Sequence, residues 1–454
     1  MGIEDRLNNL GGQLLHRRQV LKALGLLGSA AVLMGSPRIA LGKMPRKASE
    51  NSADMPGLAE SSEFIALAEL TKTVSRPGTT RSLLVTHVMP TAIEYIELVN
   101  SVFPVSSIVA IPYSANPDAV SMLTKQGYKV VVPNSVEDTF VKAREEAIFA
   151  LSNSKQPFVI QEVGGYFAEI TKELSNYPHF LGIIEDTNNG HWRYERTKPH
   201  ACRVLSMAQS PLKYVEDTII GDNVIYSVER ILREEFSAVF QGSRCAVVGF
   251  GKIGRSTAVA LKGREAVVSI YDIDPAKTIT AKVEGYHPLP LHNLLSQAEI
   301  IVGCTGQTSI RAVDIPFIRD GAILASASSK DIEFALLDFS KTCKVDKQNE
   351  LIWKYIQPNG KSFYVLYKGS PVNFRDRSIL GSVLDLIYSE LFVCIREVAE
   401  GRAPIDFQMS PPSIQNEVGK VWLRVHSAEY KAATDDKIWD YPESIALGLP
   451  ELRR

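Results

Sequence analysis

A glycine-rich turn lies between a strand-like run and a helix-like run in the middle of this 454-residue chain. Its letters are GFGKIG, with glycines at Gly249, Gly251 and Gly254. In this pattern the first glycine permits a tight turn, the second lets the backbone approach a ligand, and the third lets helix and strand pack closely. The apolar run 245–248 before it is typical of a strand buried on both faces of a parallel sheet. The turn therefore predicts a β–α–β unit whose helix N-terminus faces a phosphate-bearing ligand.

An acidic residue follows the next predicted strand at the distance that a dinucleotide site requires. The strand over 266–271 ends at Asp272, whose carboxylate would bind the ribose hydroxyls. Because an acid there repels a 2′-phosphate, we expect NAD rather than NADP, although Lys277 lies nearby. The alternative is an ordinary β–α–β turn without a ligand. The cofactor-binding residues expected in this unit are Gly249, Gly251, Lys252, Ile253, Gly254, Arg255 and Asp272.

The composition is that of a globular protein long enough for two or three domains. Fifty Lys and Arg against 51 Asp and Glu give a net charge of −1, so we expect no nucleic-acid partner. The five cysteines show no close spacing, and no His, Cys and Asp cluster has the spacing of metal ligands. We therefore expect neither a disulfide framework nor a metal site.

The N-terminus has the three parts of an export signal. The basic run 16–22 reads HRRQVLK, an apolar run over 23–34 follows, and small residues stand at Ala40 and Gly42. The apolar run is too short for a stable membrane span, and the paired arginines resemble a twin-arginine signal. We expect residues 1–42 to direct export to the periplasm. The alternative is an N-terminal tail on a cytoplasmic protein.

Predicted strands and helices alternate from residue 82 onward, which is typical of α/β proteins with parallel sheets. The predicted strands are 82–88, 107–112, 129–132, 158–163 and 180–184 in the first half, and 245–248, 266–271, 299–303, 322–325 and 361–366 in the second. Predicted helices include 91–101, 117–126, 136–152, 223–240, 257–262 and 379–400. The predicted fold class is therefore α/β, with two Rossmann-like doubly wound domains joined by a hinge. A substrate-type domain over 43–215 is completed by 374–454, and the NAD-binding domain covers 216–373.

In open α/β sheets ligands bind at the carboxyl ends of strands, where the segment Glu185–Gly190 lies. Read with the glycine-rich turn, this segment resembles the S-adenosylhomocysteine hydrolase family. The family's Glu-Glu-Thr-Thr-Thr-Gly reads Glu-Asp-Thr-Asn-Asn-Gly here, and its hinge motif Ser-x-x-Lys-x-x-x-Asp-Asn reads SPLKYVEDT over 210–218. Its Thr-Thr-Gly reads Cys-Thr-Gly over 304–306. The resemblance covers about residues 83–400 and implies further cofactor contacts from Thr187, Asn188, Asn189, Thr218, Thr305, Gly306 and Asn373.

In that family, bound NAD oxidises a nucleoside hydroxyl to a ketone, a thiol is eliminated, water adds, and the ketone is reduced again. The resemblance implies that Lys213 and Asp217 handle the hydroxyl proton and that His87 assists. Lys213 and Asp217 are four residues apart and face one side of a helix. A lysine beside the nicotinamide ring would have a lowered pKa, as a base requires. The alternative is a surface ion pair of small energy.

The departures from the family pattern fall on substrate recognition. Met89 replaces a substrate threonine, and Val163 replaces an aspartate that holds the ribose. Glu162 could replace that aspartate, but its side chain would point to the other face of the strand. Asp186 shortens a glutamate, and a family histidine is missing from the segment 326–329. A site that loses its hydrogen-bonding groups loses affinity for the original substrate.

The sequence therefore predicts a divergent family member, an NAD-dependent enzyme that transiently oxidises a hydroxyl on a nucleoside- or sugar-like small molecule. The candidate catalytic residues are Lys213, Asp217, His87, Asp186 and Glu162. Two alternatives stay open: a genuine S-adenosylhomocysteine hydrolase with a rearranged site, and a non-catalytic NAD-binding protein. The resemblance also implies a homo-oligomer, although the family's C-terminal Lys and Tyr have no clear counterpart in 447–454.

Overall fold

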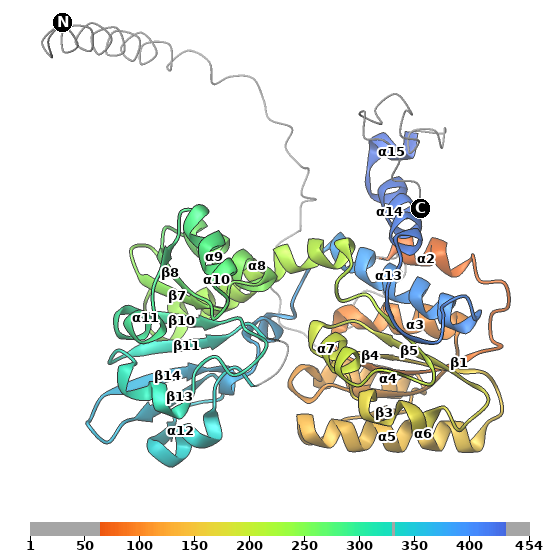
Figure 1. Cartoon of the computed structure of the whole chain (residues 1–454), viewed down its shortest axis with the longest axis horizontal. Coiled ribbons are helices and arrows are strands. Elements are labelled where there is room, and N and C mark those ends of the chain that lie inside the picture. Colours follow the sequence, from red (N-terminus) through yellow and green to blue (C-terminus); the bar gives the residue numbers. More distant parts are fainter. Residues whose placement is uncertain (1–63, 329–331, 433–454) are drawn as a thin grey trace, which may run out of the picture. The chain divides into compact units, whose positions relative to one another are not determined.

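The computed structural model describes residues 64–328 and 332–432. The expected signal-like segment 1–42 and the C-terminal residues 433–454 lie outside this part of the chain. Within it, two parallel-type sheets are each flanked by helices (Figure 1). The predicted fold class is confirmed.

Seven parallel strands form the first sheet, in the order β15-β6-β5-β4-β1-β2-β3. Read from β3, the first six strands of the chain have the 3-2-1-4-5-6 order of a Rossmann sheet. Successive side chains of β1 enter opposite cores, since Leu84 packs on one face and Leu83 and Val85 on the other. The strands are β1 (Arg81–Thr86), β2 (Val105–Ala110), β3 (Val130–Val131), β4 (Phe158–Glu162), β5 (Phe180–Glu185), β6 (Arg203–Ser206) and β15 (Asp406–Met409).

The second sheet repeats this order with the next strands of the chain. Its order is β12-β13-β14-β11-β10-β7-β8-β9, so β7 to β11 with β14 again read 3-2-1-4-5-6. The edge strands β12 and β13 run antiparallel. The strands are β7 (Arg244–Val248), β8 (Val267–Tyr271), β9 (His287–Pro288), β10 (Ile300–Gly303), β11 (Ala322–Ser326), β12 (Lys344–Lys347), β13 (Ile352–Ile356) and β14 (Ser362–Leu366).

Helices cover both faces of the two sheets, and several begin at a polar side chain that accepts a hydrogen bond from the first turn, as at Asn116, Ser135, Thr187 and Asp274. The α-helices are α2 (Ile65–Thr71), α3 (Ile93–Val102), α4 (Pro117–Lys125), α5 (Val136–Asn153), α6 (Thr171–Leu174), α7 (Asn188–Arg196), α8 (Pro211–Glu235), α9 (Lys252–Gly263), α10 (Pro275–Val283), α11 (Leu291–Gln297), α12 (Leu336–Thr342), α13 (Ser382–Ala399), α14 (Pro412–His426) and α15 (Ala428–Ala432). Short 3-10 helices are η1 (Pro90–Ala92), η2 (Pro112–Ser114), η3 (Ala168–Ile170), η4 (Ala312–Phe317), η5 (Tyr367–Gly369) and η6 (Val372–Asp376).

Helix α8 is longer than the helix predicted over 223–240 and contains the whole hinge motif. Its N-cap is Ser210, whose Oγ accepts a hydrogen bond from the Leu212 amide and donates one to buried Glu390 on α13 at 2.8 Å. The expected boundary between residues 215 and 216 thus falls inside a continuous helix. This rigid start fixes the direction in which the side chains of the hinge motif point.

Helices α8 and α9 cross closely at a glycine. A Cβ on Gly221 would lie 2.2 Å from Ser256 Oγ and 2.3 Å from the Thr257 amide nitrogen. Alanine normally stabilises a helix by up to ~1 kcal/mol over glycine, but here we expect Gly221→Ala to destabilise the protein by about 1–3 kcal/mol through overpacking. Urea denaturation measures this. In the control, Gly263→Ala on α9, the Cβ has nothing within 4 Å. Equal stability of the two variants would contradict the close crossing.

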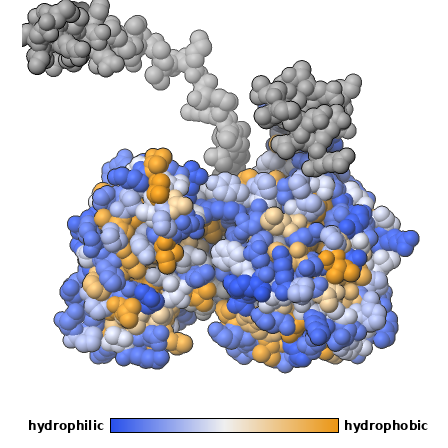
Figure 2. Space-filling view, viewed as in Figure 1, coloured by the Kyte–Doolittle hydropathy of each residue, from blue (hydrophilic) through white to orange (hydrophobic). Residues whose placement is uncertain are grey.

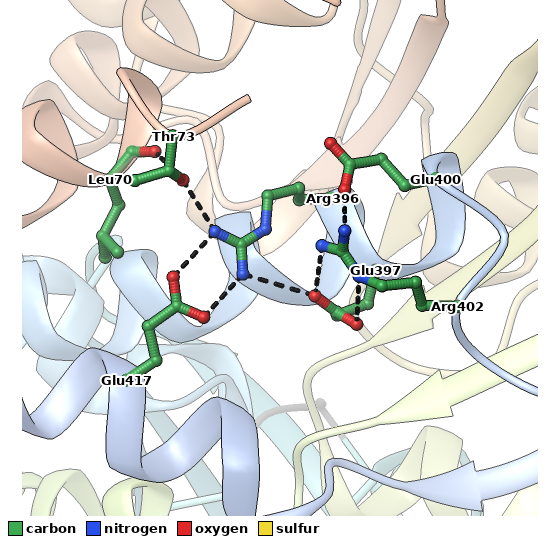
Figure 3. A network of polar contacts seen from close by, with 7 residues as sticks. All are labelled: Leu70, Thr73, Arg396, Glu397, Glu400, Arg402 and Glu417. Carbon is green, nitrogen blue, oxygen red and sulfur yellow. Dashed lines mark hydrogen bonds and ion pairs between the residues drawn. The ribbon is translucent and has the colours of Figure 1, made fainter. Parts of the chain in front are cut away.

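A network of polar contacts joins α13 to α14 and to the segment after α2 (Figure 3). The buried Arg396 guanidinium donates to both carboxylate oxygens of Glu417 at 2.7 and 2.6 Å, and to the hydroxyl of Thr73 at 2.6 Å. Nearby, Asp385 accepts hydrogen bonds from the Ala66 and Leu67 amides at the start of α2. These contacts hold α13 in place on the first sheet, next to the functional cavity.

The face drawn in Figure 2 is mostly hydrophilic, with hydrophobic residues scattered over it. Among the residues that the structure describes, the helices include none with the length and apolar character needed to cross a bilayer.

Candidate functional site

A cavity of about 860 Å³ is lined by residues from the carboxyl ends of both sheets. In a 3-2-1-4-5-6 sheet this edge carries the ligand, because the strand order reverses beside the first strand. The cavity brings together most of the residues proposed from the sequence: His87, Asp186, Thr187, Asn188, Asn189, Lys213, Asp217, Gly249, Gly251, Lys252, Ile253, Asp272, Thr305, Gly306 and Asn373.

Three predicted side chains point elsewhere. Glu162 is fully buried behind the cavity, where it accepts hydrogen bonds from the Tyr166 amide at 2.7 Å and from a tyrosine hydroxyl. Thr218 is exposed on α8 and donates its hydroxyl hydrogen to a backbone carbonyl at 2.6 Å. Arg255 forms an ion pair with Glu284 at 2.9 Å. A catalytic role for Glu162 and cofactor contacts from Thr218 and Arg255 have no geometric basis in this structure.

The glycine-rich turn has the geometry that its sequence predicts. Gly249 has a φ of +98°, which is unfavourable for other residues, and a Cβ on Gly254 would lie 1.9 Å from the Gly249 carbonyl oxygen. A Cβ on Gly251, in contrast, would meet nothing within 4 Å. Gly254 therefore serves helix–strand packing, whereas Gly251 keeps space open at the helix N-terminus.

Asp272 ends β8 beside this turn. Its carboxylate accepts hydrogen bonds from the Phe250 amide at 2.6 Å and the Asp274 amide at 2.8 Å. Lys277 lies 4.0 Å away. The acid is therefore held at the cavity by two backbone amides.

A buried glutamate that the sequence analysis missed holds the loop after β10. Glu333 is fully buried and accepts hydrogen bonds from the Thr305 and Gly306 amides, both at 2.6 Å. The Ser328 hydroxyl also donates to it. Burial raises the pKa of Glu333, although these donors oppose the shift. No local sequence motif predicts this contact, because Glu333 is 28 residues from Thr305.

Lys213 lies at the centre of a cluster of carboxylates. Its Nζ is 2.9 Å from Asp186 Oδ1 and also pairs with Glu216, one turn along α8. Burial lowers the pKa of Lys213, but Asp186, Glu216 and Asp217 outweigh burial and leave the pKa raised. The lowered pKa predicted for Lys213 is therefore not found with the protein's own groups alone. Three carboxylates surround its ammonium group, and the sequence did not show that they meet there.

Glu216, which no sequence motif marked, lines the cavity on the same face of α8 as Lys213. Burial raises the pKa of Glu216 to about 7, and Asp186 and Asp217 add to the shift while Lys213 opposes it. The i,i+3 spacing from Lys213 was the signal that could have found it. Asp217, also on this face, lies 3.4 Å from Lys252 Nζ on α9.

His87 follows β1 and packs against two aromatic rings, those of Tyr113 and Phe374, which also contact each other. Its Nδ1 is 2.6 Å from Ser114 Oγ, which donates its own hydrogen to the Ile111 carbonyl. The Ser114 oxygen therefore accepts from Nδ1–H, and this network assigns the lone pair to Nε2. Burial lowers the pKa of His87 to about 4, so the ring is neutral at pH 7.

The raised pKa of Glu216 predicts a measurable titration. Because the folded state binds this proton up to about pH 7 and the unfolded state only up to about 4.5, the free energy of unfolding falls as pH rises through this window. We expect Glu216→Gln to flatten this slope. Urea denaturation between pH 4.5 and 8 measures it. Glu69→Gln, which removes an exposed helix carboxylate, is the control. A slope unchanged in Glu216→Gln would show that Glu216 is ionised throughout.

The fold and the cavity define a two-domain dinucleotide-binding protein of the Rossmann type. Residues 225–378 match the family model described as "S-adenosyl-L-homocysteine hydrolase, NAD binding domain". The cofactor is therefore NAD, as the sequence predicted. Residues 225–378 therefore form an NAD-binding domain of the S-adenosyl-L-homocysteine hydrolase type, and the chain as a whole is similar to adenosylhomocysteinases at low identity.

The relatives that align with most of the chain share little sequence identity with it. The chain is 24% identical to the adenosylhomocysteinase of Sulfurisphaera tokodaii over 82% of its own length and 91% of the relative's. It is 25% identical to the S-inosyl-L-homocysteine hydrolase of Methanopyrus kandleri, over 58% of this chain and 62% of that one. Among solved structures, a putative D-3-phosphoglycerate dehydrogenase from Ralstonia solanacearum aligns with a TM-score of 0.43 and 11% identity, over 74% of this chain and 98% of that one.

The residues at the cavity suit NAD. The open space at Gly251 leaves room for a pyrophosphate at the N-terminus of α9, and Asp272 lies where a ribose would be bound. Asn373 lines the cavity, and its buried Oδ1 atom has no hydrogen-bond partner among the described residues. It could accept a hydrogen bond from a carboxamide, which the nicotinamide ring carries.

Proposed function

We propose that this protein is an NAD-dependent enzyme that transiently oxidises a hydroxyl group on a nucleoside- or sugar-like small molecule. The observation that carries this proposal is the cluster of Lys213, Asp186 and Glu216, which shares one cavity with the cofactor loop at Thr305 and Gly306. When bound, NAD supplies an acceptor for the hydride on the carbon that bears the hydroxyl.

The chain itself must bind the hydroxyl and remove its proton. Lys213 keeps its proton at neutral pH, so it acts as a hydrogen-bond donor that positions the substrate oxygen. A base works best when its pKa is near the operating pH, and this favours Glu216 as the acceptor of the hydroxyl proton.

A ketone formed at this position acidifies the neighbouring C–H bond, which elimination of a leaving group requires. His87 is a candidate base for that second proton, because its ring is neutral and its Nε2 carries the lone pair. Two bases with separate positions suit a reaction with two proton transfers.

Hydrolysis of S-adenosylhomocysteine itself is the second candidate. Its support is the match over 91% of a relative named adenosylhomocysteinase. Against it stand Met89 and Val163, which line the cavity where the family pattern has a hydroxyl and a carboxylate.

Export through a twin-arginine-like signal in residues 1–42 remains a proposal supported by the sequence pattern. Assembly into a homo-oligomer is likewise proposed from the resemblance. A fusion of residues 1–42 to a reporter that is active only in the periplasm would test export, with the Arg17→Lys, Arg18→Lys double variant as control.

The test of the proposed activity uses the full chain. Its nucleotide is extracted after denaturation and identified by mass, and the holoenzyme is then mixed with adenosine, S-adenosylhomocysteine and a panel of sugars and cyclic diols. We expect near-stoichiometric NAD and an absorbance increase at 340 nm with at least one alcohol. Bound NAD that no alcohol reduces would favour a non-catalytic NAD-binding protein.

A further inference from the structure

One wall of the cavity is apolar, and most of it comes from one face of α13. Leu384, Ile387 and Leu391 line the cavity at positions i, i+3 and i+7 of this helix, a spacing that forms one helical stripe. Leu380, two residues before the helix begins, lines the cavity as well and extends the stripe. Tyr388 is the fifth member of the stripe, and its phenolic hydroxyl is the one polar side-chain group among these five residues. The stripe therefore offers a ligand an apolar surface and one hydroxyl group, that of Tyr388.

Side chains from other elements extend this wall. Met89, at the start of η1, is 5% exposed and lines the same cavity, as does Val163 after β4. The ring of Phe374 lines it too and lies 4.7 Å from the His87 ring, centroid to centroid. The apolar surface thus continues from α13 to the first sheet and reaches the candidate base.

The apolar stripe also borders the charged cluster. Tyr388 is close enough to Asp186 and Glu216 for both carboxylates, after burial, to raise the pKa of its hydroxyl. The ring of Tyr388 is fixed by stacking on Tyr95 at a centroid distance of 4.1 Å. A ligand whose hydroxyl meets Lys213 would therefore lay its remaining body against the stripe.

We propose that the substrate of this enzyme carries an uncharged aromatic or aliphatic group, seated on the α13 stripe, in the place of a purine. This inference rests on the proposed function and names its substrate class: a ring-borne secondary alcohol with an apolar substituent. The oxidation is the one proposed above. The alcohol carbon gives a hydride to NAD and the alcohol oxygen gives its proton to the base, Glu216, so the products are a ketone, NADH and the protonated base. The apolar group takes no part in the bond changes.

Physical chemistry favours this class over purines. The aliphatic side chains of the stripe offer no hydrogen-bond partner to the ring nitrogens and the amine or carbonyl of a purine, and Tyr388 offers a single hydroxyl. Each buried polar group left unpaired costs about 1–3 kcal/mol. An apolar ring of similar size has no such cost and gains from leaving water.

A matched pair of ligands measures the preference for an apolar group over a purine. Adenosine and 1-phenyl-β-D-riboside share one sugar, and a benzene ring replaces the purine in the second. Calorimetric titration of the NAD-loaded full chain measures their affinities without requiring turnover. We expect the phenyl riboside to bind at least ~10-fold more tightly, because the unpaired polar groups of adenosine oppose its burial. Its binding should show a negative heat-capacity change.

Two variants locate the binding surface. Leu384, which is half-buried at the cavity, is replaced in Leu384→Asn, and we expect most of the preference for the phenyl riboside to be lost. Leu337→Asn is the matched control, since Leu337 is 84% exposed on α12 outside the cavity. If Leu384→Asn does not fold, Leu384→Ala shortens the same wall without a polar group and should weaken both the affinity and the preference.

The outcomes separate this inference from the proposed function. Tight binding of the phenyl riboside without any reduction of NAD would keep the apolar substrate class and overturn the oxidation. Equal or tighter binding of adenosine, or no binding of the phenyl riboside, would overturn the apolar class. Reduction of NAD by adenosine in that case would leave the proposed oxidation standing.

Discussion

Replacing Lys213 with methionine is expected to destabilise the protein strongly at pH 8 and much less at pH 5.5. The variant removes the only cation paired with the largely buried side chains of Asp186 and Glu216 within the described part of the chain. Breaking a buried ion pair from one side costs about 3–5 kcal/mol, because the remaining charge is left without compensation. The loss should fall as pH falls, since removal of the lysine raises the pKa of Glu216 further, and a protonated Glu216 needs no cation beside it.

Urea denaturation at the two pH values measures this effect. Lys72→Met is the matched control: Lys72 pairs with Glu69 on the surface at 2.7 Å, where removal of an exposed pair changes stability by ~1 kcal/mol or less. The double variant Lys213→Met, Glu216→Gln should recover part of the loss at pH 8. A loss that is the same at both pH values would mean that packing, rather than charge, is the main contribution of Lys213.

The same variant bears on catalysis. If Lys213 holds the substrate oxygen, Lys213→Met should lose the 340 nm signal with any alcohol that reduces NAD in the wild type, while NAD stays bound. Bound NAD is measured by mass after denaturation, so loss of the cofactor and loss of the reaction are distinguished. Retained reduction would remove Lys213 from the proposed mechanism.

Both Rossmann sheets could be predicted because their information is local. Apolar strand runs such as 245–248 alternate with helices of regular spacing, which is the pattern of a doubly wound parallel sheet. The antiparallel pair β12 and β13 and the late strand β15 could not be predicted in the same way. They are short, and β15 pairs with β6 across about 200 residues of chain.

The candidate site likewise has residues that local sequence predicts and residues that it does not. Gly249, Gly251 and Asp272 belong to one continuous motif, and the sequence alone located them. Glu333 and the apolar stripe of α13 contribute through contacts between distant segments, which no local pattern reveals. The raised pKa of Lys213 is a further case, because it follows from how three carboxylates meet and not from any one of them.

The second and third glycines of the turn, Gly251 and Gly254, are expected to have opposite effects when each is replaced by alanine. A Cβ on Gly251 meets no protein atom within 4 Å, and its φ of −74° suits alanine, so the cofactor-free protein should fold with nearly unchanged stability. The same Cβ would project into the space that the pyrophosphate must approach. We expect Gly251→Ala to weaken NAD binding by about 100-fold, or ~2.7 kcal/mol.

Gly254→Ala should show the reverse order of effects. Its Cβ would lie 1.9 Å from a backbone oxygen, which cannot move without opening the turn, so the cofactor-free protein should lose about 1–3 kcal/mol. Thermal unfolding of both cofactor-free variants and calorimetric titration with NAD separate the two effects. Unchanged NAD affinity in Gly251→Ala would show that the pyrophosphate does not lie at this turn. Since the open space at Gly251 is the structural basis for placing the cofactor there, that result would also move the reacting centre away from Lys213.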